Sequence, residues 1–457
     1  MRHILKILLC ASLILHSSFF ILHSQELSLD SCLALARRNN YEIRTSQLEI
    51  AKSQALKQQV FTKYFPQFSL QGLGYYALDP LVHFGIEDIQ SNDMRELLQA
   101  LYETVATGSD LRNEVDLMKK GASASLTVVQ PLYAGGRIVN GNKLAGLGVE
   151  AAELQSQMKE RDMLENVAST FYLVTGLQEK VATVEAALAL IDSLDRTVQV
   201  ALENGLVTRS DALQVELKRN EMLANRQQLT SGIRLARRLL CRQIGIDYSE
   251  SLVFKASPPA PLRLERGVDS RGVPPCTPVN TRPEARLLEL GVEVELLRKR
   301  LTVGETLPQV ALIGSAFYGN IIKESATGNG VALLSVSVPL TAWWETSHKL
   351  RQHDIAIEEA RMQQEHLGQM MSLEEEKAYS DMLDAWSLLR SDSSALEIAR
   401  ENYRLATLNY QVGSITLAEV LQAHALLLQA QNAITDRRTT YLVARRRLMD
   451  LGLTPSH

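Results

Sequence analysis

The sequence predicts a mainly α-helical protein with membrane-type β-strands, built as a two-fold internal repeat. Three observations predict this fold class. Short motifs recur in the same order in the two halves of the 457-residue chain. Four strand-like segments of about ten residues occupy matched places in the two halves. Long stretches without proline follow helical spacing. Each repeat is therefore expected to contain a helical stretch, one strand pair and two long coiled-coil helices.

Matched motifs define the repeat, and such self-similarity decides an architecture before any single motif does. Pro66 recurs in similar surroundings as Pro308, 242 residues later. Pro131 recurs as Pro339, only 208 residues later. Repeat 1 therefore carries 34 extra residues in the connection 77–120 between its two strands. We place this connection outside the membrane, because the outer loops of membrane barrels are the long ones.

Residues 1–24 are expected to be a secretory signal peptide that is removed on export. Arg2, His3 and Lys6 give it a charged start, and the stretch 4–22 is mostly apolar. A membrane anchor is the alternative, since the apolar run is near the lower limit for a span. We expect any membrane crossing of the mature protein to be by strands. The net charge of −4 gives no electrostatic reason to expect nucleic acid as a partner.

The first helical stretch is expected over about 28–61, and it contains Cys32. Cys32 follows Leu29, Asp30 and Ser31, which faintly resembles a lipidation box. Asp30 and the gap from the apolar run argue against lipidation, so we interpret Cys32 as a small residue of this helix. The three cysteines outside the signal segment are an odd number at long spacing, which is not typical of a disulfide framework.

The strands are expected at about 66–76 and 121–131 in repeat 1, and at about 308–318 and 330–340 in repeat 2. Their length matches a membrane-crossing strand of ~9–11 residues. Their side chains alternate weakly, as outer-membrane strands do. Between the first two strands, the amphipathic segment 94–105 predicts a short helix.

The long helices are expected at about 137–203 and 206–245 in repeat 1, and at about 345–411 and 414–452 in repeat 2. Proline is absent throughout these ranges, and it costs ~3 kcal/mol inside a helix. At 1.5 Å per residue, a helix of ~60 residues reaches ~90 Å. A coiled-coil seam with three-four spacing is formed by Ala378, Met382, Ala385, Leu389, Leu396, Ala399, Tyr403, Ala406 and Tyr410.

Gly205 and Gly413 interrupt the helical runs once each, at matched places. Asn204 before Gly205 makes a strong turn signal. We interpret both glycines as the tips of helical hairpins, with a glycine tolerated inside a continuous helix as the alternative. Between the repeats, seven of the thirteen prolines lie in 258–283. The organisation is therefore repeat 1 at 25–257, a proline-rich linker at 258–283 and repeat 2 at 284–457.

Four strands cannot close a barrel, since the smallest bacterial membrane barrels have eight. An open sheet edge in lipid leaves backbone groups unpaired, at several kcal/mol each. Other copies of the chain must therefore complete the sheet: two copies give eight strands and three give twelve. With long hairpins below it, the assembly is expected to be an oligomeric pipe with a membrane barrel at one end.

At this point the chain resembles the TolC family of outer-membrane efflux and secretion channels over essentially its whole mature length. The resemblance is carried by Leu27-Ser28-Leu29-Asp30, Leu33-Ala34-Leu35-Ala36, Asn39-Asn40, Phe65-Pro66-Gln67, Gln130-Pro131-Leu132, Gly135-Gly136, Asn204-Gly205-Leu206-Val207, Asp211, Arg282-Pro283-Glu284, Asn409-Tyr410-Gln411-Val412-Gly413 and Glu419-Val420-Leu421. It implies a homotrimer with a 12-stranded β-barrel in outer-membrane lipid, standing on a periplasmic α-helical barrel. It also implies a periplasmic adaptor (membrane fusion) protein and an inner-membrane transporter as partners, in a tripartite efflux pump or a type I secretion system.

The resemblance also implies roles for residues at the hairpins. Acidic residues just after the repeat 2 turn line the pore constriction in this family, and the matching positions are Glu419 and Gln422, of which Gln422 departs from the acidic pattern. Asp211 is the repeat 1 counterpart of Glu419. A solvated helix surface is the alternative reading of both acidic residues.

Tyr410 matches a family tyrosine that helps to hold the closed state, but the usual arginine partner is Ile415 here. Tyr410 is therefore either a gate latch or a residue of the seam. At the hairpin tips, the expected contacts of the adaptor are Gly205, Leu206, Gly413 and Ser414.

The sequence gives no sign of catalysis, since it has no HExxH motif, phosphate loop or CxxC pair. We expect no enzyme activity, no cofactor and no metal. The alternative function is that of a periplasmic coiled-coil scaffold whose strands form a soluble sheet. The cargo, whether drug, metal or protein, is not specified by these residues.

Overall fold

A computed structural model describes residues 26–78, 82–85, 95–97, 99, 114–117, 120–255, 282–320, 326–340 and 342–452. The predicted signal peptide, most of the predicted helix at 94–105 and the linker up to residue 281 lie outside the described residues. The described helices include none that is both long and apolar enough to cross a membrane.

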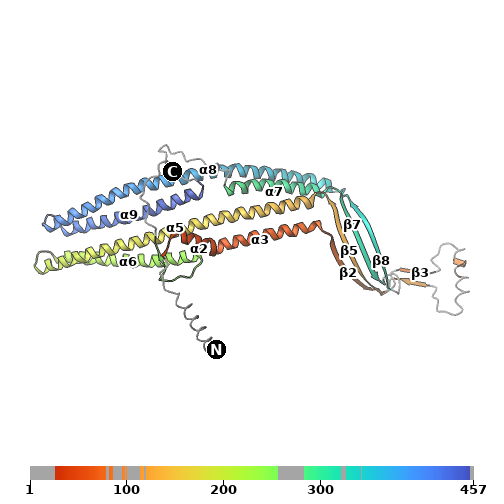
Figure 1. Ribbon diagram of the computed structural model, residues 1–457, viewed down its shortest axis with the longest axis horizontal. Coiled ribbons are helices and arrows are strands. Elements are labelled where there is room, and N and C mark those ends of the chain that lie inside the picture. The colour runs from red at the N-terminus through yellow and green to blue at the C-terminus, as the bar shows by residue number, and fades with distance from the viewer. Residues whose placement is uncertain are drawn as a thin grey trace, which may run out of the picture. The chain divides into compact units, whose positions relative to one another are not determined.

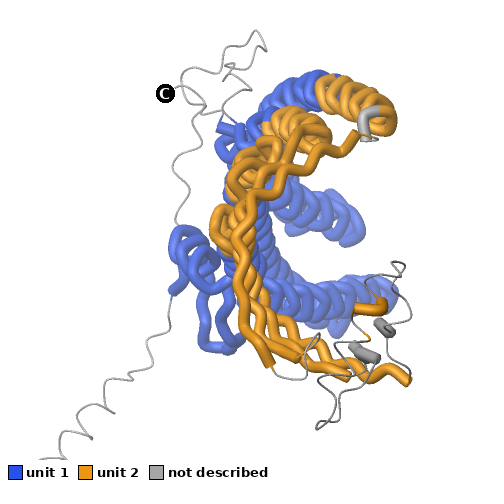
Figure 2. Tube along the Cα trace, turned by 90° about the vertical axis from the view of Figure 1, so that its right-hand side faces the viewer, with its two compact units in different colours: residues 1–51, 150–289, 362–457 blue, residues 52–149, 290–361 orange. Residues whose placement is uncertain are grey.

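The chain divides into two compact units, which Figure 2 colours separately. Unit 1 is formed by residues 1–51, 150–289 and 362–457, and unit 2 by residues 52–149 and 290–361. Each unit takes segments from both repeats, so the compact units do not coincide with the two repeats.

Unit 2 contains a four-stranded antiparallel sheet in the order β2-β5-β7-β8 (Figure 1). The strands are β2 (Gln67–Tyr76), β5 (Lys120–Ala134), β7 (Gln309–Gly319) and β8 (Thr327–Ser337). β2 and β5 are the pair of repeat 1, and β7 and β8 are the pair of repeat 2. β5 and β7 join the repeats side by side. The two-fold repeat of strand pairs and long helices that the sequence predicts is therefore the observed fold class.

The connection of repeat 1 contains a feature that the sequence did not indicate. The short strands β3 (Val82–Gly85) and β4 (Glu114–Leu117) pair antiparallel, with Val82 opposite Leu117. They lie within the 34-residue insertion, whose pattern of apolar residues had predicted only a helix. Four-residue strands are too short for a periodicity of two to stand out from the surrounding loop.

Two glycines turn the chain from β5 into the first long helix. Gly135 and Gly136 have φ of 62° and 76°, in the left-handed region that favours glycine. Gly304, one residue before the end of α7 (Pro283–Glu305), packs its backbone against Gly135, so that a Cβ on Gly135 would overlap the Gly304 carbonyl oxygen. A Cβ on Gly136 would meet nothing nearer than the Asn140 side-chain nitrogen at 3.6 Å.

Two helical hairpins lie mainly in unit 1 (Figure 1). Hairpin 1 is formed by α5 (Arg137–Glu203) with α6 (Arg209–Ile244), and hairpin 2 by α8 (Ala342–Gln411) with α9 (Leu417–Asp450). An ion pair connects the two helices of each hairpin. Arg219 pairs with Asp192 at 2.7 Å in the first hairpin, and Arg437 pairs with Asp392 at 3.0 Å in the second. The seam predicted along α8 is confirmed, since its members are all buried or half-buried.

The first helical stretch is broken in two, against the expectation of one helix over about 28–61. α2 (Leu29–Asn39) ends at Asn40, whose ψ of 134° is extended. The Asn40 side-chain oxygen accepts hydrogen bonds from the backbone N–H groups of Glu42 and Ile43, which begin α3 (Tyr41–Phe61). Its amide nitrogen donates to the Gln243 carbonyl at 2.7 Å. The break therefore depends on a tertiary contact with the end of α6.

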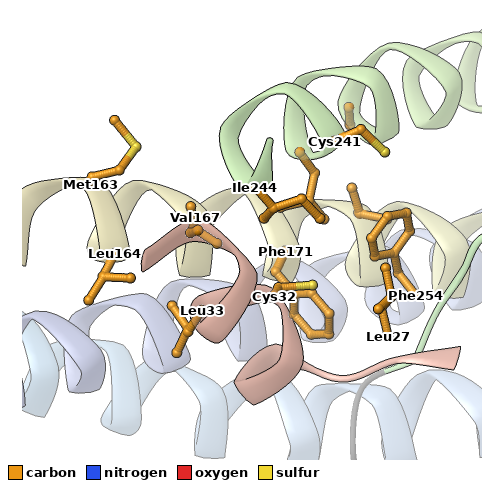
Figure 3. Close-up of a cluster of buried hydrophobic side chains, with 14 of the residues drawn as sticks. Leu27, Cys32, Leu33, Met163, Leu164, Val167, Phe171, Cys241, Ile244 and Phe254 are labelled. Atoms are coloured by element: carbon orange, nitrogen blue, oxygen red, sulfur yellow. The ribbon is translucent and has the colours of Figure 1, made fainter. Parts of the chain in front are cut away.

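A hydrophobic core joins α2, α5 and α6 (Figure 3). Cys32 is 0% exposed in this core, beside Phe171 and Ile244. Burial, with a smaller contribution from Cys241, raises the pKa of the Cys32 thiol to about 12. There is no room for a lipid on this sulfur in the folded chain, which agrees with the interpretation of Cys32 as a small helix residue.

An ion network explains the Arg282-Pro283-Glu284 motif. Arg282 is 7% exposed and pairs with Glu374 of α8 at 3.1 Å, while Glu284 pairs with Arg161 of α5 at 2.6 Å. Arg447 of α9 also pairs with Glu374, at 3.2 Å. Burial acts to raise the pKa of Glu374, but hydrogen bonds from Arg282 and Arg447 outweigh it and lower that pKa. The start of α7 is thereby tied to three long helices.

We predict that Gly135→Ala destabilises the protein more than Gly136→Ala. Both variants force alanine into the left-handed region, at about 1–2 kcal/mol. Only Gly135→Ala adds a clash with the Gly304 backbone, and overpacking costs about 1–3 kcal/mol more. Thermal unfolding of the two purified variants measures the difference, and equal midpoints would contradict the close approach of Gly135 and Gly304.

Candidate functional site at the hairpin tips

The two hairpin tips have the same backbone structure, at matched places in the two repeats. Gly205 and Gly413 have φ of 74° and 78°. At the first tip, the N–H of Gly205 donates to the Leu202 carbonyl and the N–H of Leu206 to the Ala201 carbonyl. These two bonds form a Schellman motif, in which a left-handed glycine ends a helix. The second tip repeats it, with Gly413 and Ser414 donating to Tyr410 and Asn409. Both glycines end helices, so the alternative of a continuous helix is excluded.

A capping box begins the returning helix at each tip. The Asp211 carboxylate accepts from the Thr208 backbone N–H at 2.9 Å, and the Thr208 hydroxyl oxygen accepts from the Asp211 N–H at 3.2 Å. Thr416 and Glu419 form the same reciprocal pair, at 2.7 Å and 3.4 Å. Hydrogen bonds from the Thr208 side chain and backbone lower the pKa of Asp211. Both candidate constriction carboxylates therefore satisfy helix N–H groups that would otherwise lack partners.

The capping boxes were readable in the sequence but were missed there. Threonine followed three residues later by an acidic residue, ahead of an apolar run, is a known sign of a helix start. The family resemblance implied a role only for the charge of Asp211 and Glu419. The structure gives each carboxylate a local structural role in addition to any role in a pore.

The exposed face of α9 carries the other expected constriction position. Glu419 and Gln422 are both exposed, and their separation of three residues puts them on one side of the helix. Leu417, Val420 and Ala423 are buried on the opposite side. Near its tip, α9 thus presents a polar stripe made of a carboxylate followed by an amide.

Tyr410 and Asp211 are brought together from different repeats. Tyr410, at the end of α8, packs against a core that contains Ala212 of α6 and Leu417 of α9. Burial raises the pKa of Tyr410, and the nearby negative charge of Asp211 raises it further. Tyr410 is therefore a half-buried residue of the seam, and it also faces a carboxylate.

The tips themselves are exposed. Gly205, Gly413 and Ser414 are exposed, Leu206 is 79% exposed, and Val412 beside the second tip is 75% exposed. These large apolar side chains are therefore mostly in contact with water. Exposed apolar groups at a projecting turn are suited to a contact with another molecule.

The sheet of unit 2 is the second candidate functional surface, because its register separates two different faces. Residues opposite each other in paired strands share a face. One face, here named the apolar face, includes Phe68, Leu70, Leu126, Val128, Val310, Leu312, Gly314, Ala316, Ala332, Leu334 and Val336. The other is here named the polar face because it carries most of the hydroxyl and amide side chains of the sheet: Gln67, Ser69, Gln71, Ser123, Ser125, Thr127, Gln309, Ser315, Asn329, Ser335 and Ser337. Its composition is mixed, since it also carries Leu73, Tyr75, Val129, Ile313, Phe317, Val331 and Leu333.

The described part of the chain leaves the apolar face uncovered. Leu70 is 77% exposed, Phe68 71% and Leu334 62%. On the polar face, the Thr127 and Ser315 hydroxyls are hydrogen-bonded across β5 and β7 at 3.1 Å. The outer edges of β2 and β8 pair with no further strand among the described residues. The sheet thus exposes an apolar surface and two rows of backbone hydrogen-bonding groups.

Comparisons with known proteins agree with this architecture. Residues 284–451, which span the second repeat, match the family model for outer membrane efflux proteins. The sequence has no match among curated proteins. Among solved structures, the outer-membrane channel OprN is 16% identical with a TM-score of 0.73, over 93% of this chain and 90% of that chain.

Two further solved structures cover the chain to a similar extent. The outer membrane protein VceC of Vibrio cholerae is 16% identical with a TM-score of 0.69, over 94% of this chain and 97% of that one. The outer membrane channel CmeC of Campylobacter jejuni is 14% identical with a TM-score of 0.73, over 94% of this chain and 87% of that one. The chain therefore has an outer membrane efflux protein domain and the fold of these channels. The resemblance to TolC-family channel proteins is confirmed by the family model over residues 284–451 and by the fold over nearly the whole chain.

We predict that Thr416→Ala frays the start of α9, whereas Thr416→Ser does not. Alanine removes the hydroxyl that accepts from Glu419, and loss of an N-cap costs about 0.5–2 kcal/mol. Serine keeps the hydroxyl and so serves as the matched control. Hydrogen–deuterium exchange of the amides at 417–420 measures the effect. The same exchange rate in both variants would show that the capping box does not hold this tip.

Proposed function

We propose that the protein is the outer-membrane exit duct of a tripartite efflux pump or of a type I secretion system. The observation that carries the proposal is the sheet with one apolar face, one polar face and two unpaired edges. The outer membrane efflux protein domain at 284–451 supports the same assignment. The mature chain would lie mainly in the periplasm, with its strands in the outer membrane and its signal peptide removed.

The two faces of the sheet fit a barrel wall. In membrane barrels, apolar side chains face lipid and polar ones face the lumen. Phe68, Leu70 and Leu334 would contact outer-membrane lipid, and the hydroxyl and amide side chains of the polar face would line the water-filled interior. A soluble sheet with this much apolar surface in water would be prone to association.

The two open edges suggest how the barrel closes. An edge of β2 in one copy can pair with an edge of β8 in the next, which leaves no strand edge in lipid. Three copies give twelve strands, and the resemblance to the family favours this homotrimer over a dimer of eight strands. The helical hairpins of three copies would form the periplasmic helical barrel.

The hairpin tips are the proposed meeting point with partners. Gly205, Leu206, Gly413 and Ser414 would contact a periplasmic adaptor protein, which connects the duct to an inner-membrane transporter. We propose that Glu419, Gln422 and Asp211 line the pore constriction at this end. Tyr410, which faces Asp211 across the repeats, would hold hairpin 2 against hairpin 1 in the closed state.

The duct is proposed to be passive. Its partners would supply the energy, and opening would require hairpin 2 to move away from hairpin 1. No catalytic step is assigned to the chain. The cargo would be selected by the transporter, and not by these residues.

The first test is the detergent-corrected mass of the protein extracted from the membrane fraction. We expect a detergent-dependent particle of about three mature chains, because the apolar face and the strand edges need a continuous barrel in lipid. A soluble monomer or dimer would contradict the duct and favour a periplasmic scaffold with a soluble sheet.

We predict that Glu419→Ala and Glu419→Gln both lower the cation preference of the channel in planar bilayers. A ring of carboxylates at a narrow mouth favours cations, and both variants remove that charge. Glutamine keeps an oxygen that can accept from Thr416, so it separates the charge from the cap. Unchanged selectivity in the glutamine variant would remove Glu419 from the constriction.

A further inference from the structure

His424 is a buried histidine at the contact between the repeats. It lies on α9, five residues after Glu419 and two after Gln422, and it is 4% exposed. Its ring packs against Tyr403 of α8, with ring centroids 5.4 Å apart. Its Nδ1 atom is buried and has no hydrogen-bond partner in the described part of the chain. A buried polar atom without a partner is unusual in a native structure and calls for an explanation.

The groups around His424 disfavour a proton on it. Burial is the main cause that lowers the pKa of the imidazole, and the positive charge of Lys218 on α6 is the second. Lys218 is itself paired with Glu221 of the same helix at 2.7 Å. From α8, the titratable group that faces His424 is the Tyr403 phenol. A carboxylate that could stabilise a charged imidazole is absent from these described contacts.

The helices around His424 are those that hold the two hairpins together. α6 belongs to hairpin 1, whereas α8 and α9 form hairpin 2. Their shared core contains Val215 and Met222 of α6 together with Leu417 and Leu428 of α9. A proton on His424 would place an unpartnered charge beside this core and opposite the ammonium of Lys218. A movement of α9 away from α6 would let water reach the charged imidazole and would remove this cost.

We propose that His424 is an acid-sensitive switch that loosens the packing of hairpin 2 against hairpin 1. The loosening rests on the burial of His424, its unpartnered Nδ1 atom and its packing against Tyr403, and its effect on a channel rests on the proposed function. In a duct, acidification would raise the fraction of time for which the periplasmic end is open.

The direction of the pH dependence follows from the coupling between proton binding by His424 and the packing of the hairpins. In the packed state the pKa of His424 is below its ordinary value, and in an opened state, where water reaches the ring, it returns toward about 6.5. The packed state is therefore fully stable at a pH above the ordinary pKa of histidine. It loses stability as the pH falls through the lower pKa that His424 has in the packed state. The population of the opened state rises by up to about tenfold for each pKa unit between the two states.

The first experiment compares hydrogen exchange of the detergent-solubilised full chain at about pH 7.5 and about pH 5, the range in which histidine titrates. Wild type is compared at each pH with His424→Phe, which keeps an aromatic ring beside Tyr403 but cannot take up a proton. We expect several-fold weaker protection of the amides at 417–428 in wild type than in His424→Phe at the lower pH only. His366→Phe, which replaces an exposed histidine of α8, should behave as wild type.

Lys218→Met gives an independent check that does not alter the imidazole. Without the ammonium, the pKa of His424 should rise toward its ordinary value, so the acid response should be smaller than in wild type but present. Equal acid responses in wild type and His424→Phe, or no response in wild type, would overturn the proposal. An unchanged response in Lys218→Met would overturn the part assigned to Lys218.

Bilayer conductance then separates this inference from the proposed function. We expect the open probability of wild type to rise on acidification and that of His424→Phe to stay constant. The same rise in both proteins would overturn the switch while leaving the duct intact. Loss of protection on acidification without channel formation by either protein would overturn the duct while leaving the loosening intact.

Discussion

The buried seam along the long helices is the interaction on which the rest of the structure depends. A helix gains little from hydrogen bonding alone, so most of its stability comes from the apolar face that it buries. In α8 that face is a narrow line of residues, among them Ala378, Met382, Ala385 and Leu389. Small and large side chains alternate along it, and the small ones let neighbouring helices approach closely. The seam occupies residues 378–410, so it fixes the packing of the second half of the 70-residue helix α8.

The hairpin tips are the places where this seam must reverse. Each reversal uses a left-handed glycine to end one helix and a threonine–carboxylate capping box to begin the next. These devices satisfy the backbone groups at the helix ends without any other part of the chain. A tip is therefore free to project, and its apolar side chains remain exposed. The same carboxylates that cap the helices are those proposed for the constriction, so their structural and functional roles are joined at Asp211 and Glu419.

Duplication has different consequences in the two units. In unit 2, the strand pairs of the two repeats join through β5 and β7 into one sheet with a common apolar face. In unit 1, the two hairpins pack through α6 and α9, but the contacts there are not copies of each other. Tyr410 of repeat 2 faces Asp211 of repeat 1, and His424 faces Lys218. The two hairpins therefore contribute different side chains to the contact, although their sequences are related by the repeat.

The sequence by itself determined the elements that depend on local pattern. Proline-free runs, three-four spacing and matched glycines predicted the long helices and their hairpins, and the alternation near Pro66 and Pro308 predicted the strands. Only the tertiary structure decided features that depend on residues distant in the chain. The helix break at Asn40 needs the Gln243 carbonyl, the closeness of Gly135 needs Gly304, and the two faces of the sheet need the register between the strands. The physical reason is that helix and strand periodicity depends on residues within one turn or one pleat. Burial, register and the pairing of charges depend instead on which distant segments come into contact.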